Sequence, residues 1–240
     1  RSPSRGLGDV YKRQLENVNL KVHEGECLGV VGDNGAGKST LMKVLSGLYK
    51  PSAGALFFEG KEHVLDSPKD SQNLGLEMVY QDLALAGNLP IGENIFLGRE
   101  PTKNIGFLKF LDFKKIQEMT SAHLEKLKIN VKSAEQKVEE LSGGQRQAVA
   151  IARSTAFNAK VVIMDEPTAA LAIKEVGKVL DLINKLKNTG VGVIVISHRM
   201  DDIFTVCDRV MALFQGTNFA ESQLDKTSRD EVIGWIMGKK

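Results

Sequence analysis

The stretch from position 32 to position 40 restricts the possible folds of this chain more than any other part of it. It reads Gly32-Asp33-Asn34-Gly35-Ala36-Gly37-Lys38-Ser39-Thr40 and fits the pattern G-x-x-x-x-G-K-[ST]. A continuous apolar run at residues 27–31 precedes it, and a helical pattern at residues 38–48 follows it. This order predicts a buried parallel strand, a tight glycine turn and a helix that begins at the turn.

The chemistry of this stretch favours a phosphate group as its ligand. Glycines let the backbone wrap closely, so that its N–H groups converge on phosphate oxygens at the positive end of the helix dipole. Lys38 supplies a cation for the β- and γ-phosphates, and the Ser39 hydroxyl can hold Mg²⁺. The expected contacts come from Gly32, Asn34, Gly35, Gly37, Lys38, Ser39 and Thr40. The stretch predicts a nucleoside triphosphate site, and alone it leaves kinases, GTPases, motors and other ATPases open.

Strand and helix patterns alternate over most of the chain and predict an α/β fold with a mainly parallel sheet. The expected strands lie at residues 15–22, 27–31, 55–58, 76–79, 161–164, 193–196 and 209–213. The expected helices outside the insert lie at residues 38–48, 174–187 and 229–237. From residue 82 to residue 140 strand patterns are absent and apolar residues fall at helical spacing. We therefore expect one domain at residues 15–240, in which a helical subdomain at about residues 82–157 interrupts the α/β core.

Composition excludes several classes of protein. The 240 residues include 32 basic and 30 acidic side chains, a balance that does not indicate a nucleic-acid partner. The longest apolar runs are far short of the roughly 20 residues that cross a bilayer. Cys27 and Cys207 are far apart in sequence and lack metal-ligand spacing, so we expect both to be reduced. Residues 1–14 fit no strand or helix pattern and are interpreted as a non-native start or as a disordered native tail.

A second motif, which consists of two acidic residues, follows the apolar run at residues 161–164. A buried strand there would present Asp165 beside the glycine turn, where its carboxylate can hold Mg²⁺. Glu166 comes next and is placed to polarise an attacking water as a general base. The alternative is a buried strand that ends by chance in two solvated acids.

The segment Leu141-Ser142-Gly143-Gly144-Gln145 narrows the class further. Two glycines at a helix start expose N–H groups to a second anion, and Ser142 adds a hydroxyl; read alone, the segment could be only a helix N-cap. It resembles the signature motif LSGGQ of the ABC ATPase family, and its distance of about 20 residues from Asp165 agrees with that family. By this resemblance the chain has the ABC ATPase fold, and Ser142, Gly143, Gly144 and Gln145 contact ATP.

Two further residues match the family in order along the chain. Gln81 follows the strand predicted at residues 76–79 and resembles the family's Q-loop, which senses Mg²⁺ and the attacking water. His198 follows the strand predicted at residues 193–196 and resembles the switch histidine that contacts the γ-phosphate. The resemblance implies an ATPase with Glu166, His198 and Gln81 as catalytic residues and with Ser39, Gln81 and Asp165 around Mg²⁺.

The resemblance also implies partners. In the family the glycine turn of one subunit and the LSGGQ of another close over one ATP, so hydrolysis needs a head-to-tail dimer. Ser142 and Gly144 would then serve the ATP of the partner rather than the ATP bound at Lys38. The helical insert would dock on transmembrane permease subunits at the cytoplasmic face of the membrane, with a sugar-binding protein engaged indirectly.

The stretch 92–100, with Asp33-Asn34 and the segment 167–171, resembles the ATPases of bacterial importers of ribose, galactose, xylose and fructose. Many of those proteins carry two ATPase halves, so this chain is a single-half member or part of a tandem protein. Two positions depart from the wider family: Tyr11 is out of register for an adenine-stacking aromatic residue, and Ala172 stands where an Asp is common. The rivals are a soluble ABC ATPase without a transport role, a GTPase and a non-catalytic nucleotide sensor.

Overall fold

The computed structural model describes residues 14–239, so the interpretation of residues 1–13 and of Tyr11 lies outside the described part of the chain. The strands are β1 Cys27–Val31, β2 Leu56–Phe58, β3 Lys61–His63, β4 Leu76–Val79, β5 Thr102–Ile105, β6 Leu108–Leu111, β7 Val161–Asp165, β8 Gly192–Ile196, β9 Arg209–Phe214 and β10 Thr217–Gln223. The α-helices are α1 Lys38–Leu45, α2 Pro68–Asn73, α3 Ile91–Phe96, α4 Phe113–Leu127, α5 Gly143–Thr155, α6 Ile173–Asn188, α7 Met200–Val206 and α8 Arg229–Ile236. Two short 3-10 helices lie at Val138–Glu140 and Leu224–Lys226.

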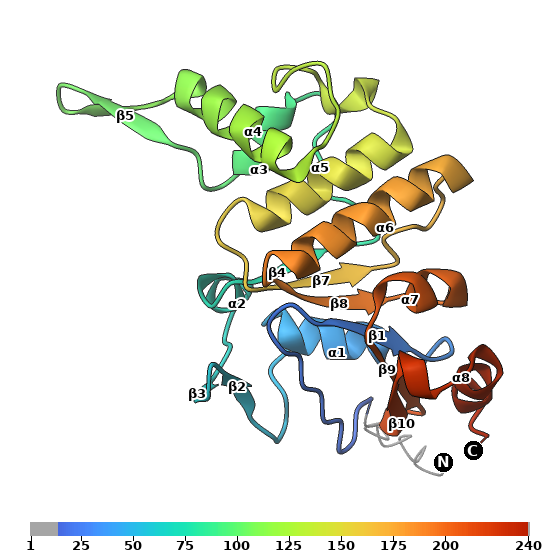
Figure 1. The fold of residues 1–240 in the computed structure, drawn as a ribbon. Coiled ribbons are helices and arrows are strands. Elements are labelled where there is room, and N and C mark those ends of the chain that lie inside the picture. Colours follow the sequence, from blue (N-terminus) through green and yellow to red (C-terminus); the bar gives the residue numbers. More distant parts are fainter. Residues whose placement is uncertain (1–13, 240) are drawn as a thin grey trace, which may run out of the picture.

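The central sheet has the strand order β10-β9-β1-β8-β7-β4. Neighbouring strands pair in parallel except β10, which pairs with β9 in antiparallel fashion. The mainly parallel α/β fold expected from the sequence is therefore confirmed. Figure 1 shows α5 and α6 above this sheet and α1 below it. Because parallel strands share one carboxyl edge, the segments that follow β1, β7 and β8 meet on one side of the molecule.

Both faces of the sheet are buried, which explains the unbroken apolar runs. Successive residues of a strand point to opposite faces. In β8, Val193 and Val195 pack into the larger core with α5 and α6, whereas Ile194 and Ile196 pack into the smaller core between the sheet and α1. The strands predicted at 27–31, 76–79, 161–164, 193–196 and 209–213 accordingly agree with β1, β4, β7, β8 and β9.

The strand predicted at residues 15–22 is wrong. Leu15, Val18, Leu20 and Val22 do pack against the smaller core, as their alternation indicated. However, Asn17 has a φ of 51°, a left-handed conformation that interrupts an extended backbone. The segment is held instead by separate bonds, such as the one from the Glu16 N–H to the Gly216 carbonyl at 2.8 Å. Alternation thus reported burial here and not strand pairing.

The expectation of no strands between residues 82 and 140 is also wrong. β5 and β6 form an antiparallel hairpin that extends away from the rest of the molecule (Figure 1). All residues of both strands are exposed, and Phe107 at the turn is 96% exposed. A hairpin without a buried face has no hydrophobic alternation to reveal it. The strand predicted at residues 55–58 agrees with β2, whereas β3, α2, α7 and β10 were not expected.

The rest of the segment 82–157 contains α3, α4, α5 and one short 3-10 helix, joined by loops. α3 packs against the end of α5 through an edge-on contact between Phe96 and Phe157, with ring centres 5.5 Å apart. The buried Asn94 side chain accepts a hydrogen bond from the Ala86 N–H at 2.8 Å and donates to nearby carbonyls, which fixes the loop before α3. The division at about residues 82–157 stays a prediction. Within residues 14–239 there is no helix whose length and apolar content would let it span a membrane.

Candidate nucleotide-binding and hydrolysis site

The glycine turn joins β1 to α1 and leaves no room for a side chain at Gly32. A Cβ atom on Gly32 would lie 2.5 Å from the Leu213 carbonyl oxygen, so the backbone passes closer to β9 than any other residue would permit. Gly37 caps α1 with a φ of 107°, and no side chain caps the helix there. The first N–H groups of α1 are therefore directed at the turn, as an anion requires.

Lys38 lies over the turn. Its ammonium donates to the Gly32 carbonyl at 2.6 Å and to the Asp33 carbonyl at 3.0 Å. Partial burial lowers the pKa of Lys38, and the nearby carboxylates of Glu166 and Asp165 oppose that change. This lysine is thus a cation held between the turn and the acidic end of β7.

The remaining turn residues are differently engaged. Asn34 is exposed, and its N–H donates to the Asp33 carboxylate at 2.7 Å. Ser39 and Gly35 are exposed, and no atom within 4 Å would obstruct a Cβ on Gly35. The Thr40 hydroxyl donates to the Gln14 side-chain oxygen at 2.6 Å. Gly35 and Ser39 are therefore open to solvent, and a ligand above the turn could reach their donor groups.

β7 ends in Asp165, with Glu166 directly after it. Burial, and then the charge of Glu166, raise the pKa of Asp165 above its usual range. Glu166 has a φ of 49°, which is uncommon for a residue with a side chain. The bond from its N–H to the Ile196 carbonyl, at 2.8 Å, fixes this backbone against the end of β8. The sharp turn directs two carboxylates to one place at the carboxyl edge of the sheet.

Glu166 and His198 form a hydrogen-bonded pair. His198 Nδ1 lies 2.8 Å from Glu166 Oε1, and the His198 N–H donates to the same oxygen at 3.1 Å. The Ser197 hydroxyl donates to the other oxygen of Glu166 at 3.4 Å. The Glu166 side chain is only 13% exposed, whereas that of His198 is 71% exposed. The carboxylate is therefore enclosed, and the imidazole extends towards solvent. Ser197 was not predicted as a site residue, although it directly precedes His198.

Buried polar residues support this pair from behind. The Thr168 hydroxyl donates to the Asp202 carboxylate in a wholly buried contact, and Arg199 Nε lies 3.4 Å from the same carboxylate. Thr168 follows Glu166 by two positions, and Arg199 follows His198. Asp202 therefore joins the two loops that carry the pair, a role that no sequence motif indicated.

The LSGGQ-like segment forms the N-terminus of α5. The Ser142 hydroxyl accepts from the Gln145 N–H at 3.3 Å, and the Gln145 side chain accepts from the Ser142 N–H at 3.0 Å, which is a capping box. Gln145 also donates to the Asn130 carbonyl at 3.0 Å. Across residues 14–239 no hydrogen bond or ion pair joins this segment to the glycine turn. The two predicted phosphate-binding segments begin helices on opposite faces of the sheet and have no direct polar contact within the described chain (Figure 1).

Gln81 is exposed, and no hydrogen bond in the described chain connects it to Glu166 or Lys38. The loop that follows it is held by α5. Arg153, in the last turn of α5, donates to the Leu83 carbonyl at 2.8 Å and to the Ala84 carbonyl at 2.6 Å. The helix that begins at Ser142 is thus bonded at its other end to the loop after Gln81.

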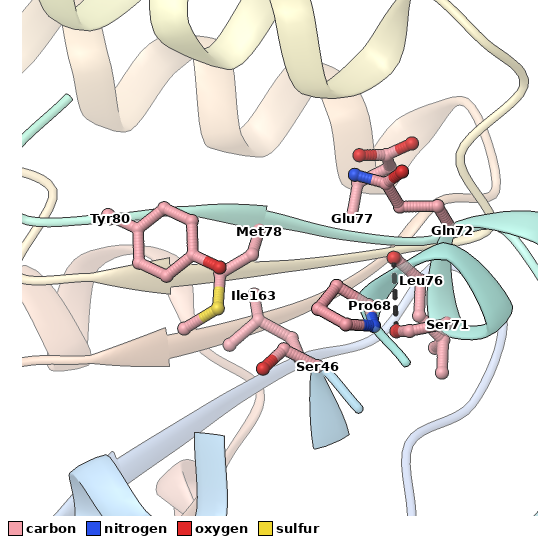
Figure 2. Close-up of a pocket in the computed structure, with 9 residues that line it drawn as sticks. All are labelled: Ser46, Pro68, Ser71, Gln72, Leu76, Glu77, Met78, Tyr80 and Ile163. Carbon is pink, nitrogen blue, oxygen red and sulfur yellow. Dashed lines mark hydrogen bonds between the residues drawn. The ribbon is translucent and has the colours of Figure 1, made fainter. Parts of the chain in front are cut away.

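A small cavity beneath β4 is not the nucleotide site. It measures about 50 Å³, and Ser46, Ser71 and Tyr80 are among the residues that line it (Figure 2). Ligand pockets of drug size are typically roughly 300–1,000 Å³. The Ser71 hydroxyl points to the Leu76 carbonyl across 3.4 Å, which indicates a packing gap with a local bond. None of the predicted site residues lines this cavity.

The arrangement described so far defines a phosphate-binding turn beside a paired acid and histidine, which is the site of a P-loop nucleotide-hydrolysing protein. Comparison with known proteins gives the family. The family model described as "ABC transporter" matches residues 15–169. The chain belongs to the ABC transporter family and carries its ATPase domain.

Similar proteins agree with this family. The chain is 45% identical over 231 residues to a xylose/arabinose import ATP-binding protein of Sulfolobus acidocaldarius, covering 94% of this chain and 90% of that protein. It is 36% identical over 237 residues to a ribose import ATP-binding protein of Caldanaerobacter subterraneus, covering 99% of this chain but 47% of the relative. The chain therefore spans nearly the length of the first relative and about half the length of the second.

Solved structures show the same fold. An ATP-binding cassette of an ABC transporter in its ADP conformation is similar with a TM-score of 0.78 at 27% identity, covering 93% of this chain and 89% of the other. A second cassette, solved as a dimer bound to ADP and phosphate after hydrolysis, has a TM-score of 0.71 at 28% identity and covers 88% of this chain and 90% of that one. The ABC ATPase fold expected from the LSGGQ resemblance is confirmed.

Proposed function

We propose that this chain binds and hydrolyses Mg²⁺-ATP as one subunit of a head-to-tail dimer that powers a sugar importer. The observation that carries the proposal is the separation of two phosphate-binding segments in one chain. The turn with Lys38 and the Glu166–His198 pair forms one half of a site. The Ser142–Gly144 segment begins α5, on the other face of the sheet from α1, and would form the other half. Two chains are needed to join the halves over one ATP.

The residues of the two halves have different roles in binding and hydrolysis. Lys38 and the N–H groups of the turn bind the β- and γ-phosphates and offset their charge. Glu166 accepts a proton from the attacking water, and its bonds to His198 and Ser197 hold its carboxylate in place. His198 donates from Nδ1 to Glu166 and presents Nε2 to solvent. Nε2 would donate to a γ-phosphate oxygen when the ring carries both protons. Ser142 and Gly144 of a second chain supply donors from the opposite side.

The residues present fit a magnesium ion that is shared with the nucleotide. Among residues 14–239 no group of three or more His, Cys, Asp or Glu side chains could hold a metal ion alone. Mg²⁺ in nucleotide sites is commonly held by one or two protein oxygens together with phosphates and water. Ser39 and Asp165 would supply the protein oxygens, with Gln81 nearby once its loop closes. The ion would neutralise charge on the phosphates.

The role in sugar import is supported by the relatives. Their names describe import of xylose and arabinose in one case and of ribose in the other. We propose that the chain acts at the cytoplasmic face of a membrane, that α3, α4 and the β5–β6 hairpin contact permease subunits, and that a sugar-binding protein acts through that permease. Exposed apolar side chains in this region, including Leu97, Phe107 and Phe113, suit such a contact. These relatives favour transport over a soluble ABC ATPase with another role.

The two-chain site is tested by the ATP hydrolysis rate per chain, measured with Mg²⁺ over a hundredfold range of protein concentration. We expect the rate per chain to rise with concentration and then level off, because only dimers contain a complete site. The Lys38→Ala variant should show no such rise. A rate per chain that does not depend on concentration would mean that one chain suffices, and would contradict the proposal.

The transport role is tested in the source cells. Deleting the gene should abolish uptake of one sugar in a radiolabelled panel of xylose, arabinose, ribose and galactose, while amino-acid uptake is unchanged. The parent gene should restore that uptake and the Glu166→Gln variant should not. Unchanged uptake of every sugar in the panel would contradict the import assignment and leave the ATPase assignment standing.

A further inference from the structure

Glu175 lies across the N-terminus of α5. It belongs to the first turn of α6, the neighbouring helix. A Cβ atom on Gly144 would lie 2.8 Å from the Cβ of Glu175 and 3.0 Å from its carboxyl carbon. A Cβ on Gly143 would lie 3.6 Å from Glu175 Oε2. The side chain is therefore stretched over both glycines of the LSGGQ segment, and only glycine leaves room for it at position 144.

The carboxylate of Glu175 uses the anion-binding groups of this segment. It accepts hydrogen bonds from the Ser142 side chain and from the Gly144 N–H, and these bonds hold the pKa of Glu175 below its usual range. Glu175 is therefore negatively charged at neutral pH. The two donors are the groups that the proposed function assigns to the ATP of the partner chain. One hydroxyl has one proton to donate, so Ser142 cannot bond to Glu175 and to a γ-phosphate at once.

We propose that Glu175 is a positioning residue that occupies the phosphate-binding groups of the signature segment in the single chain and must leave them before an ATP-bound dimer closes. This inference rests on the proposed function. The Glu175 carboxylate can move away from these donors because the side chain lies at the surface. Lys178, one turn further along α6, interacts with the same carboxylate and offers it an alternative partner. Until it leaves, its negative charge also opposes the approach of the partner's phosphates. Glu175 thus sets the protein concentration at which ATP drives dimerisation.

The test uses the full chain with Glu166→Gln in every variant, so that ATP is not consumed. Analytical ultracentrifugation with saturating Mg²⁺-ATP gives the concentration at half-dimerisation for the parent, Glu175→Gln and Glu175→Ala. We expect Glu175→Ala to lower that concentration about tenfold or more, because a bond to a charged group no longer has to be broken. Glu175→Gln should shift it in the same direction. Asp181→Asn, which removes an exposed acid from the same helix, should leave it unchanged.

A structural role for Glu175 predicts the opposite sign. If Glu175 only fastens α6 to α5, its replacement would lower the melting temperature and raise the concentration needed for dimers, which overturns the inference. An unchanged midpoint would overturn it too. Monomer affinity for ATP should stay within twofold of the parent in every variant, which shows that the turn at Lys38 is folded. If none of the variants dimerises with ATP at any concentration, the two-chain site itself is wrong.

Discussion

Replacing Glu166 by Gln should leave ATP binding intact and lower the hydrolysis rate by about 10²–10⁴-fold, the usual contribution of a positioned general base. Gln has the same shape as Glu, so its carbonyl can still accept from the His198 N–H, which lies 3.1 Å from Glu166 Oε1. What is lost is the ability to take a proton from water. Because ATP then persists, the dimer should accumulate instead of dissociating. Single-turnover hydrolysis and size-exclusion chromatography measure the two effects.

The matched control for that variant is Glu118→Gln. Glu118 lies on α4 and is largely exposed, with only a long contact to Lys114, so the same chemical change there should leave the rate unaltered. Hydrolysis by Glu166→Gln at the parent's rate would mean that another group activates the water. It would remove Glu166 from the catalytic assignment while leaving the nucleotide site in place.

Replacing Lys38 by Ala should weaken ATP binding by at least about 100-fold, a change of roughly 2.7 kcal/mol in binding free energy. The ammonium is partly buried and lies above the turn, where its charge is less screened than on the surface. Its removal also leaves the Asp165 and Glu166 carboxylates facing the phosphates without the cation between them. Isothermal titration with a non-hydrolysable ATP analogue, in the presence of Mg²⁺, measures the loss.

Lys43→Ala is the corresponding control for Lys38→Ala. Lys43 lies in the last turn of the same helix and contacts the Tyr49 ring from 5.1 Å rather than the turn. Its removal should change ATP affinity less than threefold. If Lys38→Ala binds ATP as well as Lys43→Ala does, the backbone N–H groups of the turn suffice and the role of the lysine is wrong.

The parallel core could be predicted from the sequence because burial on both faces leaves a visible trace. Strands such as β8 need apolar residues at every position, and such runs are hard to mistake. Exposed elements leave no comparable trace. The β5–β6 hairpin has no buried face, and each of its strands places a lysine among other exposed residues, so nothing in the pattern separates it from a helix or loop. The alternation at residues 15–22 misled for the converse reason, since it reported burial only.

The residues of the candidate site also fall into those that the sequence predicted and those that it did not. Lys38, Asp165 and Glu166 could be predicted because they lie in the glycine turn or at the end of a buried strand, whereas His198 was predicted from the family resemblance. The sheet then brings the ends of those strands together. Glu175 and Asp202 were missed because their roles depend on contacts between helices and loops. Cys27 and Cys207 show the same limit. They are distant in sequence and both free, as expected, yet their sulfur atoms lie 3.5 Å apart.

α5 connects two places that bind different nucleotides under the proposed arrangement. Its first residues face the ATP of the partner, and Arg153 in its last turn holds the loop after Gln81, beside the chain's own ATP. Over 13 residues this helix is about 20 Å long. Thermodynamic reciprocity makes the coupling between the two places equal in both directions. If the partner's ATP changes the affinity at the Gln81 loop, then binding at that loop changes the affinity for the partner's ATP by the same free energy. The two sites of such a dimer would fill and empty as a cooperative pair.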